Sequence, residues 1–345
     1  MAADGGLLRL ELELADGVVR AATIRSTRPK RLGRLFHGRR ADEAAALARV
    51  LFTLCGRAHA AAAALAAATA LGRPLGDETL RREAVGVLAE RVFETLRACV
   101  MGWPSADCRT AAALREALAA AQALAKDGGQ EALAALRRAA AALGFGEDEP
   151  GPDTALGRIL RDCEATPALT PIALDPLTPD DDAAVAAALL ADEDFAAAPA
   201  LPGRRPETGA FARVRPTGAV FAARARARLL DIRRALAELE GLAPAKAAPG
   251  RGLIACGLLG ERSAFAAVET ARGRLYHALT CDNMDRILIY GMVAPTEWNF
   301  HPRGPFVGRV LGARLGRVET ARDAADRLAR LVDPCCAFET AVREI

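Results

Sequence analysis

The amino-acid sequence predicts a mainly α-helical fold with small antiparallel β-sheets, an α+β protein in which helices dominate. Alanine, the strongest helix former, supplies 81 of the 345 residues, whereas aromatic residues make up only 4%. Strands favour aromatic and β-branched side chains, so this composition disfavours a sheet-dominated fold. Several long segments repeat their apolar residues with the helical period, and a short segment near the amino terminus alternates with a period of two.

The expected elements follow in order along the chain. Leu8 to Leu14 alternates leucine with charged residues, Asp16 and Gly17 make a turn, and Val18 to Ile24 returns, which predicts a β-hairpin. The segment 41–71 predicts one long alanine-rich helix, because its leucines follow one helix face. Further helices are expected at about 77–101, 110–126, 129–143, 217–242 and 320–332.

Composition and charge argue against several classes of partner. The 46 basic and 43 acidic side chains leave a net charge of +3, and no basic motif interleaves with aromatics, so nucleic acid is not expected as a partner. The longest apolar run, Ala60 to Leu71, is too short for a membrane span, which needs about 20 residues. The amino terminus lacks the pattern of a secretory signal, so we expect a cytoplasmic protein without a membrane partner.

Common catalytic motifs do not occur in the sequence. It contains no glycine-rich phosphate loop, no GxSxG and no HExxH, and its serines number three. The eight cysteines include no CxxC pair and follow no disulfide framework. Nucleotide binding, serine hydrolysis and a hydrolytic zinc site are therefore disfavoured.

Two cysteines, Cys55 and Cys335, are candidate functional thiols because of the residues around them. Phe52, Cys55 and His59 are spaced i, i+3 and i+7, so on the expected helix they form one stripe, and His59 could hydrogen-bond a thiolate at Cys55. Near the other end of the chain, an aspartate and a proline stop a helix just before Cys335. Taken singly, each cysteine is better explained as a small buried apolar residue.

Five ordered stretches of the sequence resemble the large subunits of nickel-iron hydrogenases. Residues 38–42 and 54–59 are similar to that family's Gly-Arg-Asp-Pro and Arg-Ile-Cys-Gly-x-Cys-x-x-x-His motifs. The other similar stretches are 207–209 with 212–213 and 224–226 (Thr-Gly and Arg-x-x-Ala-Arg), 269–277 (Glu-Ala-Pro-Arg-Gly-x-Leu-x-His), 293–303 (Val-Pro-Thr-Thr-Trp-Asn-x-x-Pro-Arg) and 333–335 (Asp-Pro-Cys). The resemblance runs over residues 8–341 and is absent from about 105–205.

The resemblance implies a single large-subunit-like domain over residues 1–345, a shortened helical bundle with a variable Ala/Pro-rich insertion zone at about 105–205. It also implies a small sheet near residues 275–295 and a central meeting of Cys55 with Cys335. Within the insertion zone, we interpret the acidic residues 180–182 as part of a solvated linker, with a partner site as the alternative.

The departures from the family pattern concern the metal. Phe52 and Phe338 stand where the family has nickel-binding cysteines, Ala341 replaces the closing histidine, and Gly33 replaces the proton-conducting glutamate. Phenylalanine has no lone pair to offer, so these positions cannot build the family's four-thiolate nickel site. We therefore expect neither nickel nor hydrogen turnover.

The retained residues match family positions around the iron. Cys55 and Cys335 would hold iron as thiolates, and Arg272 and Thr296 match the positions that face the iron's cyanide ligands. Pro295 would contribute an apolar wall for carbon monoxide, and His59 completes the set as a partner of the thiolate. This combination resembles the HupK/HoxV group of hydrogenase expression and formation proteins.

That resemblance implies a non-enzymatic maturation scaffold that carries or assembles an Fe(CN)2CO unit for transfer to the hydrogenase large subunit. The implied partners are iron-cofactor assembly chaperones and the large subunit itself. Two alternatives stay open: a divergent nickel-iron hydrogenase large subunit with redox activity, and a metal-free docking module for maturation factors.

Several residue assignments also stay open. In the family, Cys335 corresponds to a terminal nickel ligand, so the adjacent Cys336 is an alternative iron ligand. Arg272 could instead form a buried ion pair with Glu269, and His59 could be a core histidine without a metal role. The remaining cysteines and histidines are expected to be packing residues or inert thiols.

Overall fold

The computed structural model describes residues 6–103, 107–218, 220–243 and 248–345. Its helices are α1 (Ala44–Leu51), α2 (Gly56–Ala70), α3 (Asp77–Met101), α4 (Cys108–Asp127), α5 (Gln130–Ala142), α6 (Ala155–Glu164), α7 (Asp182–Ala191), α8 (Ala210–Val214), α9 (Val220–Leu242), α10 (Pro295–Asn299), α11 (Pro305–Val310) and α12 (Val318–Val332). Its strands are β1 (Leu7–Ala15), β2 (Val18–Ser26), β3 (Ile254–Gly260), β4 (Ser263–Glu269), β5 (Arg274–Cys281), β6 (Ile287–Val293) and β7 (Ala337–Glu344). Short 3-10 helices are η1 (Leu32–Phe36), η2 (Ala41–Glu43), η3 (Pro179–Asp181) and η4 (Phe195–Ala197).

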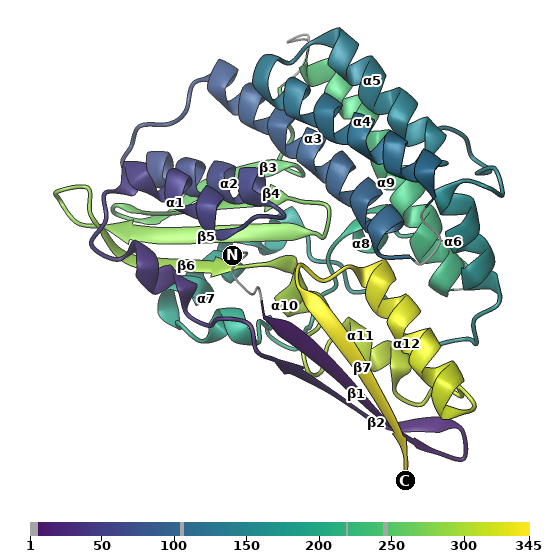
Figure 1. The fold of residues 1–345 in the computed structure, drawn as a ribbon. Helices are drawn as coiled ribbons and strands as arrows, with labels where there is room; N and C mark the ends of the chain where they lie inside the picture. The colour runs from purple at the N-terminus through teal and green to yellow at the C-terminus, as the bar shows by residue number, and fades with distance from the viewer. Residues whose placement is uncertain (1–5, 104–106, 219, 244–247) are drawn as a thin grey trace.

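An antiparallel sheet in the order β3-β4-β5-β6 forms one half of the molecule (Figure 1). Helix α2 packs on one face of the sheet against β4 and β5, and α7 contacts β5 and β6. Nearly every residue of β4 and β5 is therefore buried. Alanines fill much of this space, because small side chains let the helices approach the sheet closely.

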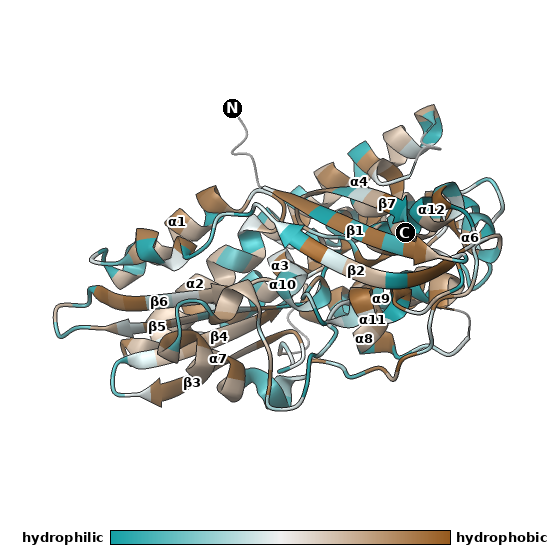
Figure 2. Cartoon of the chain, turned by 90° about the horizontal axis from the view of Figure 1, so that it is seen from below, coloured by the Kyte–Doolittle hydropathy of each residue, from teal (hydrophilic) through white to brown (hydrophobic). Residues whose placement is uncertain are grey.

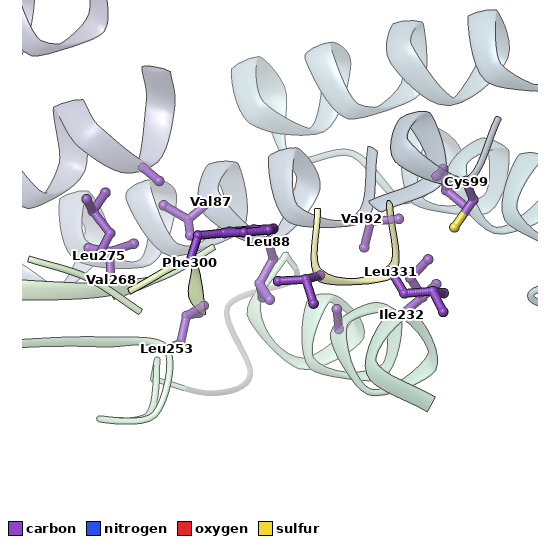
Figure 3. Close-up of a cluster of buried hydrophobic side chains, with 14 of the residues drawn as sticks. Val87, Leu88, Val92, Cys99, Ile232, Leu253, Val268, Leu275, Phe300 and Leu331 are labelled. Carbon is purple, nitrogen blue, oxygen red and sulfur yellow. The ribbon is translucent and has the colours of Figure 1, made fainter. Parts of the chain in front are cut away.

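A helical bundle forms the other half, with α3 packed against α4 and α9, and α9 also contacting α5, α6 and α12. The two halves share one core. Figure 3 shows buried side chains of α3, among them Leu88 and Val92. They lie between Leu275 of β5 on one side and Ile232 of α9 and Leu331 of α12 on the other. A mainly α-helical fold with small antiparallel sheets is thus confirmed.

A second sheet, in the order β2-β1-β7, covers the end of the molecule where α11 and α12 lie. Its β1-β2 hairpin confirms the predicted one, with four alternate leucines of β1 buried, and Figure 2 shows the alternation of hydrophobic and hydrophilic residues along β1. Strand β7 was not predicted, and it pairs with β1 in parallel, so that Leu8 lies opposite Phe338. The carboxy-terminal segment is thereby anchored beside the amino-terminal one.

The helix predicted at 77–101 is confirmed with these bounds, but the single helix predicted over 41–71 is wrong. The chain leaves helical geometry between Phe52 and Cys55, and a new helix starts at Gly56. The Glu90 carboxylate accepts hydrogen bonds from the backbone N–H groups of Arg57 (2.9 Å) and Ala58 (3.0 Å), two first-turn donors that a helix start leaves without partners. A half-buried carboxylate from α3 therefore fixes the helix break.

The zone at about 105–205 contains α4 to α7, and α4 packs along α3. The interpretation of residues 180–182 as a solvated linker is wrong for Asp182, which is 3% exposed. Its carboxylate accepts hydrogen bonds from Nε and Nη2 of Arg274, at 2.6 and 2.5 Å. Arg274 is fully buried, so Asp182 compensates a charge inside the molecule, while the Asp180 side chain is exposed.

Candidate functional site

Cys55 occupies the turn between α1 and α2, at the position that caps the amino terminus of α2. Its carbonyl accepts the backbone N–H of His59, and its side chain is half-buried. Burial raises the pKa of the Cys55 thiol well above its usual range, the charge of Cys335 raises it further, and the Arg272 guanidinium acts in the opposite direction. The thiolate form at this position therefore depends on nearby positive charge.

Cys335 follows the end of α12, where Asp333 adopts a left-handed backbone conformation and Pro334 prevents the helix from continuing. The Thr296 side chain holds this turn in place. Its hydroxyl donates to the Cys335 sulfur at 3.2 Å and accepts the Cys335 backbone N–H at 3.1 Å. The predicted Thr296 is thus close to a thiol, and its hydroxyl is engaged by that thiol.

The structure brings Cys55 and Cys335 close enough for their charges to interact, although 280 residues separate them in the sequence. Cys336 lies beside them. Burial raises the pKa of its thiol to about 12, and the charge of Cys335 adds to that shift. Cys335 thus interacts electrostatically with both Cys55 and Cys336, and these three thiols, near the starts of α2 and β7, make up the thiol cluster.

Arg272 is 4% exposed and faces this cluster. Its guanidinium pairs with Glu94 (Nη2 to Oε2, 3.2 Å) and Asp333 (Nε to Oδ2, 3.2 Å). The suggested ion pair with Glu269 is wrong, because Glu269 pairs with Arg213 and Arg274 instead. Burial alone would lower the pKa of Arg272, but Asp333, Glu94 and the two thiols raise it above its ordinary value.

A second guanidinium faces the same thiols and was not predicted from the sequence. Arg28, just after β2, pairs with Glu297 at 2.5 Å. Burial lowers the pKa of Arg28, but Cys335 and Glu297, followed by Cys336 and Cys55, raise it above the ordinary value. No sequence motif marks Arg28, since it stands in a run of basic residues whose other members are exposed, and its own half-burial becomes visible only in the fold.

His59 does not hydrogen-bond the Cys55 thiol in the part of the chain that the structure describes. Its Nδ1 lies 2.8 Å from Nε2 of His277, whose Nδ1 lies 2.5 Å from the Tyr290 hydroxyl. Phe52 stacks on the His59 ring with the centroids 3.6 Å apart. Burial lowers the pKa of His59 well below its usual value and that of His277 to about 3, so both rings are neutral at pH 7.

A cavity of about 120 Å³ lies beside Arg28 and has Phe52, His59 and Glu297 among its lining residues, but none of the three cysteines of the thiol cluster. Pro295 is the first residue of α10 and is buried, and its neighbour Ala294 lines the cavity. Gly33 also lines the cavity, and a Cβ atom at this position would overlap the carbonyl oxygen of Tyr290. Any larger side chain at Gly33, including a glutamate, requires η1 to move away from β6.

Among the residues with a described placement, no three His, Cys, Asp or Glu side chains come together as a group that could hold a metal ion. The other cysteines are dispersed. Cys99 accepts a hydrogen bond from Arg228, whereas Cys108 and Cys256 are exposed. The two ion-paired guanidiniums beside three thiols are thus what distinguishes this site from other cysteines in the chain.

Solved structures of two hydrogenases share the fold of this chain. The Ni-Fe-Se hydrogenase of Desulfovibrio vulgaris Hildenborough superimposes with a TM-score of 0.64 at 16% identity, over 94% of this chain and 95% of that one. The Ni-Fe-Se hydrogenase of Desulfomicrobium baculatum gives a TM-score of 0.60 at 14% identity, over 94% of this chain and 95% of that one. The protein therefore has the hydrogenase large-subunit fold.

Curated relatives resemble the chain over nearly its whole length. The hydrogenase expression/formation protein HupK of Rhizobium leguminosarum is 40% identical over 98% of this chain and 97% of its own length. HupK of Bradyrhizobium diazoefficiens is 37% identical over 91% of this chain and 90% of its own length. The chain belongs to this HupK family of hydrogenase expression/formation proteins, as the sequence predicts. No protein-family model matches it.

Within the described residues, none of the helices combines the length and the apolar character that a membrane crossing requires.

Proposed function

We propose that this protein holds an iron unit carrying two cyanides and one carbonyl, Fe(CN)2CO, as cargo for transfer to a hydrogenase large subunit. The observation that carries the proposal is that the thiols of Cys55, Cys335 and Cys336 interact with two guanidiniums, those of Arg28 and Arg272. Thiolates are soft ligands suited to iron, and cyanide nitrogens accept hydrogen bonds from guanidinium groups. The donor set therefore fits this anionic cargo.

Each residue of the cluster has a distinct task in this proposal. Cys55 and Cys335 bind the iron as thiolates and lose their protons when they do so. Arg28 and Arg272 compensate the negative charge that two thiolates and an anionic cargo introduce into a poorly solvated site. The Thr296 hydroxyl orients Cys335, and Pro295 provides an apolar surface.

Cys335 is preferred to Cys336 as the second ligand, because Thr296 donates one hydrogen bond to the Cys335 sulfur and accepts another from its backbone N–H, which together hold Cys335 in one orientation. Hydrogen bonds of this kind change metal affinity by about 10- to 100-fold when they are lost. We expect Thr296→Val to lose iron about tenfold faster than the unchanged protein. Thr280→Val, which loses a hydrogen bond to Ser263 on the distant sheet, is the matched control.

The proposal is tested by infrared spectroscopy on protein purified anaerobically from cells that express the iron-cofactor machinery. We expect carbonyl and cyanide stretching bands, with iron and without nickel in the same sample. Cys55→Ala and Cys335→Ala should lose the bands, and Cys256→Ala, which removes an exposed thiol, should keep them. Retention in Cys335→Ala with loss in Cys336→Ala would make Cys336 the ligand.

Two other outcomes would replace the proposal. Stoichiometric nickel together with hydrogen uptake would identify a divergent large subunit. A metal-free docking module would give a different pair of results. The purified protein would lack the bands and still co-purify with maturation factors, and the Cys55→Ala variant would still support hydrogenase maturation.

A further inference from the structure

A small cavity lies on the helical-bundle side of Arg272, lined by residues of α8, α9 and the end of α12. It measures about 20 Å³, somewhat more than the roughly 10–15 Å³ that one water needs, so it has room for one water or one small ion. Three buried guanidiniums, those of Arg224, Arg228 and Arg272, contribute to its wall. Asp333 is the one carboxylate among the described lining residues. This concentration of positive charge in so small a space calls for a compensating negative charge.

The carboxylates near the cavity do not balance its guanidiniums. Arg224 pairs with Glu207 at 2.6 Å, and Arg272 pairs with Glu94 and Asp333. Arg228 is 5% exposed, yet in the described part of the chain it meets two backbone carbonyls and the sulfur of Cys99, and no carboxylate.

A fourth buried arginine increases the imbalance. Arg309 is 3% exposed and stacks, like Arg224, over the ring of Phe211, which lines the cavity. No ion pair or side-chain hydrogen bond engages Arg309 among the described residues. Four buried guanidiniums thus share three carboxylates, and one of these, Glu94, also pairs with Arg97.

Unused hydrogen-bond donors point to the same conclusion. Nε of Arg224 and Nε of Arg272 are both buried without a hydrogen-bond partner, although the latter lies 3.2 Å from Asp333. A buried charged donor that lacks a partner is costly, so native proteins usually satisfy it with a side chain, a water or an ion. A water would satisfy the donors but would leave the surplus charge uncompensated.

We propose that this cavity binds a small monovalent anion of about the size of chloride, held by the guanidiniums of Arg224, Arg228 and Arg272. The anion balances the surplus charge and accepts hydrogen bonds from the guanidiniums that line the cavity. This inference does not depend on the iron cargo, because it concerns the protein without iron.

Bromide is the probe, since it replaces chloride and is visible by anomalous scattering. Crystals grown without halide and soaked in sodium bromide should show an anomalous peak in the cavity. In solution, chloride titration followed by ³⁵Cl line broadening should give at least tenfold weaker binding for Arg228→Met than for the unchanged protein. Arg226→Met, which removes an exposed guanidinium from the same helix, is the matched control and should bind as the unchanged protein does.

Density for water alone without an anomalous peak would overturn the proposal, as would equal chloride affinity in the Arg228→Met and Arg226→Met variants. If Arg228→Met does not fold, Arg309→Met provides the second variant. It removes the surplus charge without altering the cavity wall, and it should weaken chloride binding several-fold. The bromide map of the unchanged protein decides the question independently of any variant.

Discussion

The buried histidine pair makes a quantitative prediction about stability and pH. His59 and His277 are 1% and 0% exposed, and they are neutral in the folded protein because burial penalises the charged ring. In the unfolded chain each regains an ordinary pKa of about 6.5. Below pH 6.5 the unfolded state therefore binds more protons than the folded state, so stability is fully present above pH 6.5 and falls as the pH decreases toward the folded pKa.

The magnitude follows from the shift of His277, whose folded pKa is about 3. Between pH 8 and pH 5 its unfolded form gains nearly a full proton, and the folded form gains almost none. One pKa unit corresponds to about 1.4 kcal/mol, so His277 alone removes about 2 kcal/mol of unfolding free energy over this interval. His59 contributes in the same direction.

The assay is urea unfolding at pH 8 and pH 5, with the difference in unfolding free energy as the readout. We expect His277→Gln to reduce this difference by about 2 kcal/mol, whatever it does to stability at pH 8. His37→Gln changes an exposed histidine and should leave the difference unaltered. The reasoning is wrong if His277→Gln keeps the full pH dependence, since His277 would then be charged or solvated in the folded state.

Two further predictions concern stability. Asp182→Asn leaves the fully buried Arg274 without its main charge partner and should cost about 3–5 kcal/mol of unfolding free energy, whereas Asp180→Asn changes an exposed carboxylate and should stay within about 0.5 kcal/mol. Gly33→Ala places a Cβ atom against the Tyr290 carbonyl and should cost about 3 kcal/mol, whereas Gly250→Ala enters open space and should cost nothing measurable. Denaturant unfolding of each pair checks both, and equal effects within a pair would contradict the structural explanation.

The sequence predicts the fold best where local patterns agree with tertiary packing. The helix at 77–101 and the amino-terminal hairpin are examples, because their periodicity and end signals coincide. The break at Phe52 was missed because it depends on Glu90, a carboxylate more than thirty residues away. Strand β7 was missed because it has one buried residue and derives its structure from β1.

The site was predictable to the extent that motifs mark it. Cys55 and Cys335 stand at motif positions, and their proximity follows from the fold. Arg28 carries no motif, and its role depends on the approach of β2 to α10, which local sequence does not encode. The predicted hydrogen bond between His59 and the Cys55 thiol was wrong for the same reason. The actual partner, His277, belongs to β5, which only the folded sheet brings beside α2.

The parallel pairing of β1 with β7 has a consequence for the order of folding. The two strands are more than 300 residues apart, so their contact belongs to the slowest class of folding events, those that close very long loops. Cys335 precedes β7 directly and reaches Cys55 once the last strand has been synthesised and docked. During translation Cys55 therefore emerges long before Cys335. The two thiols come together only late in folding, after the segment that contains β7 has docked on β1.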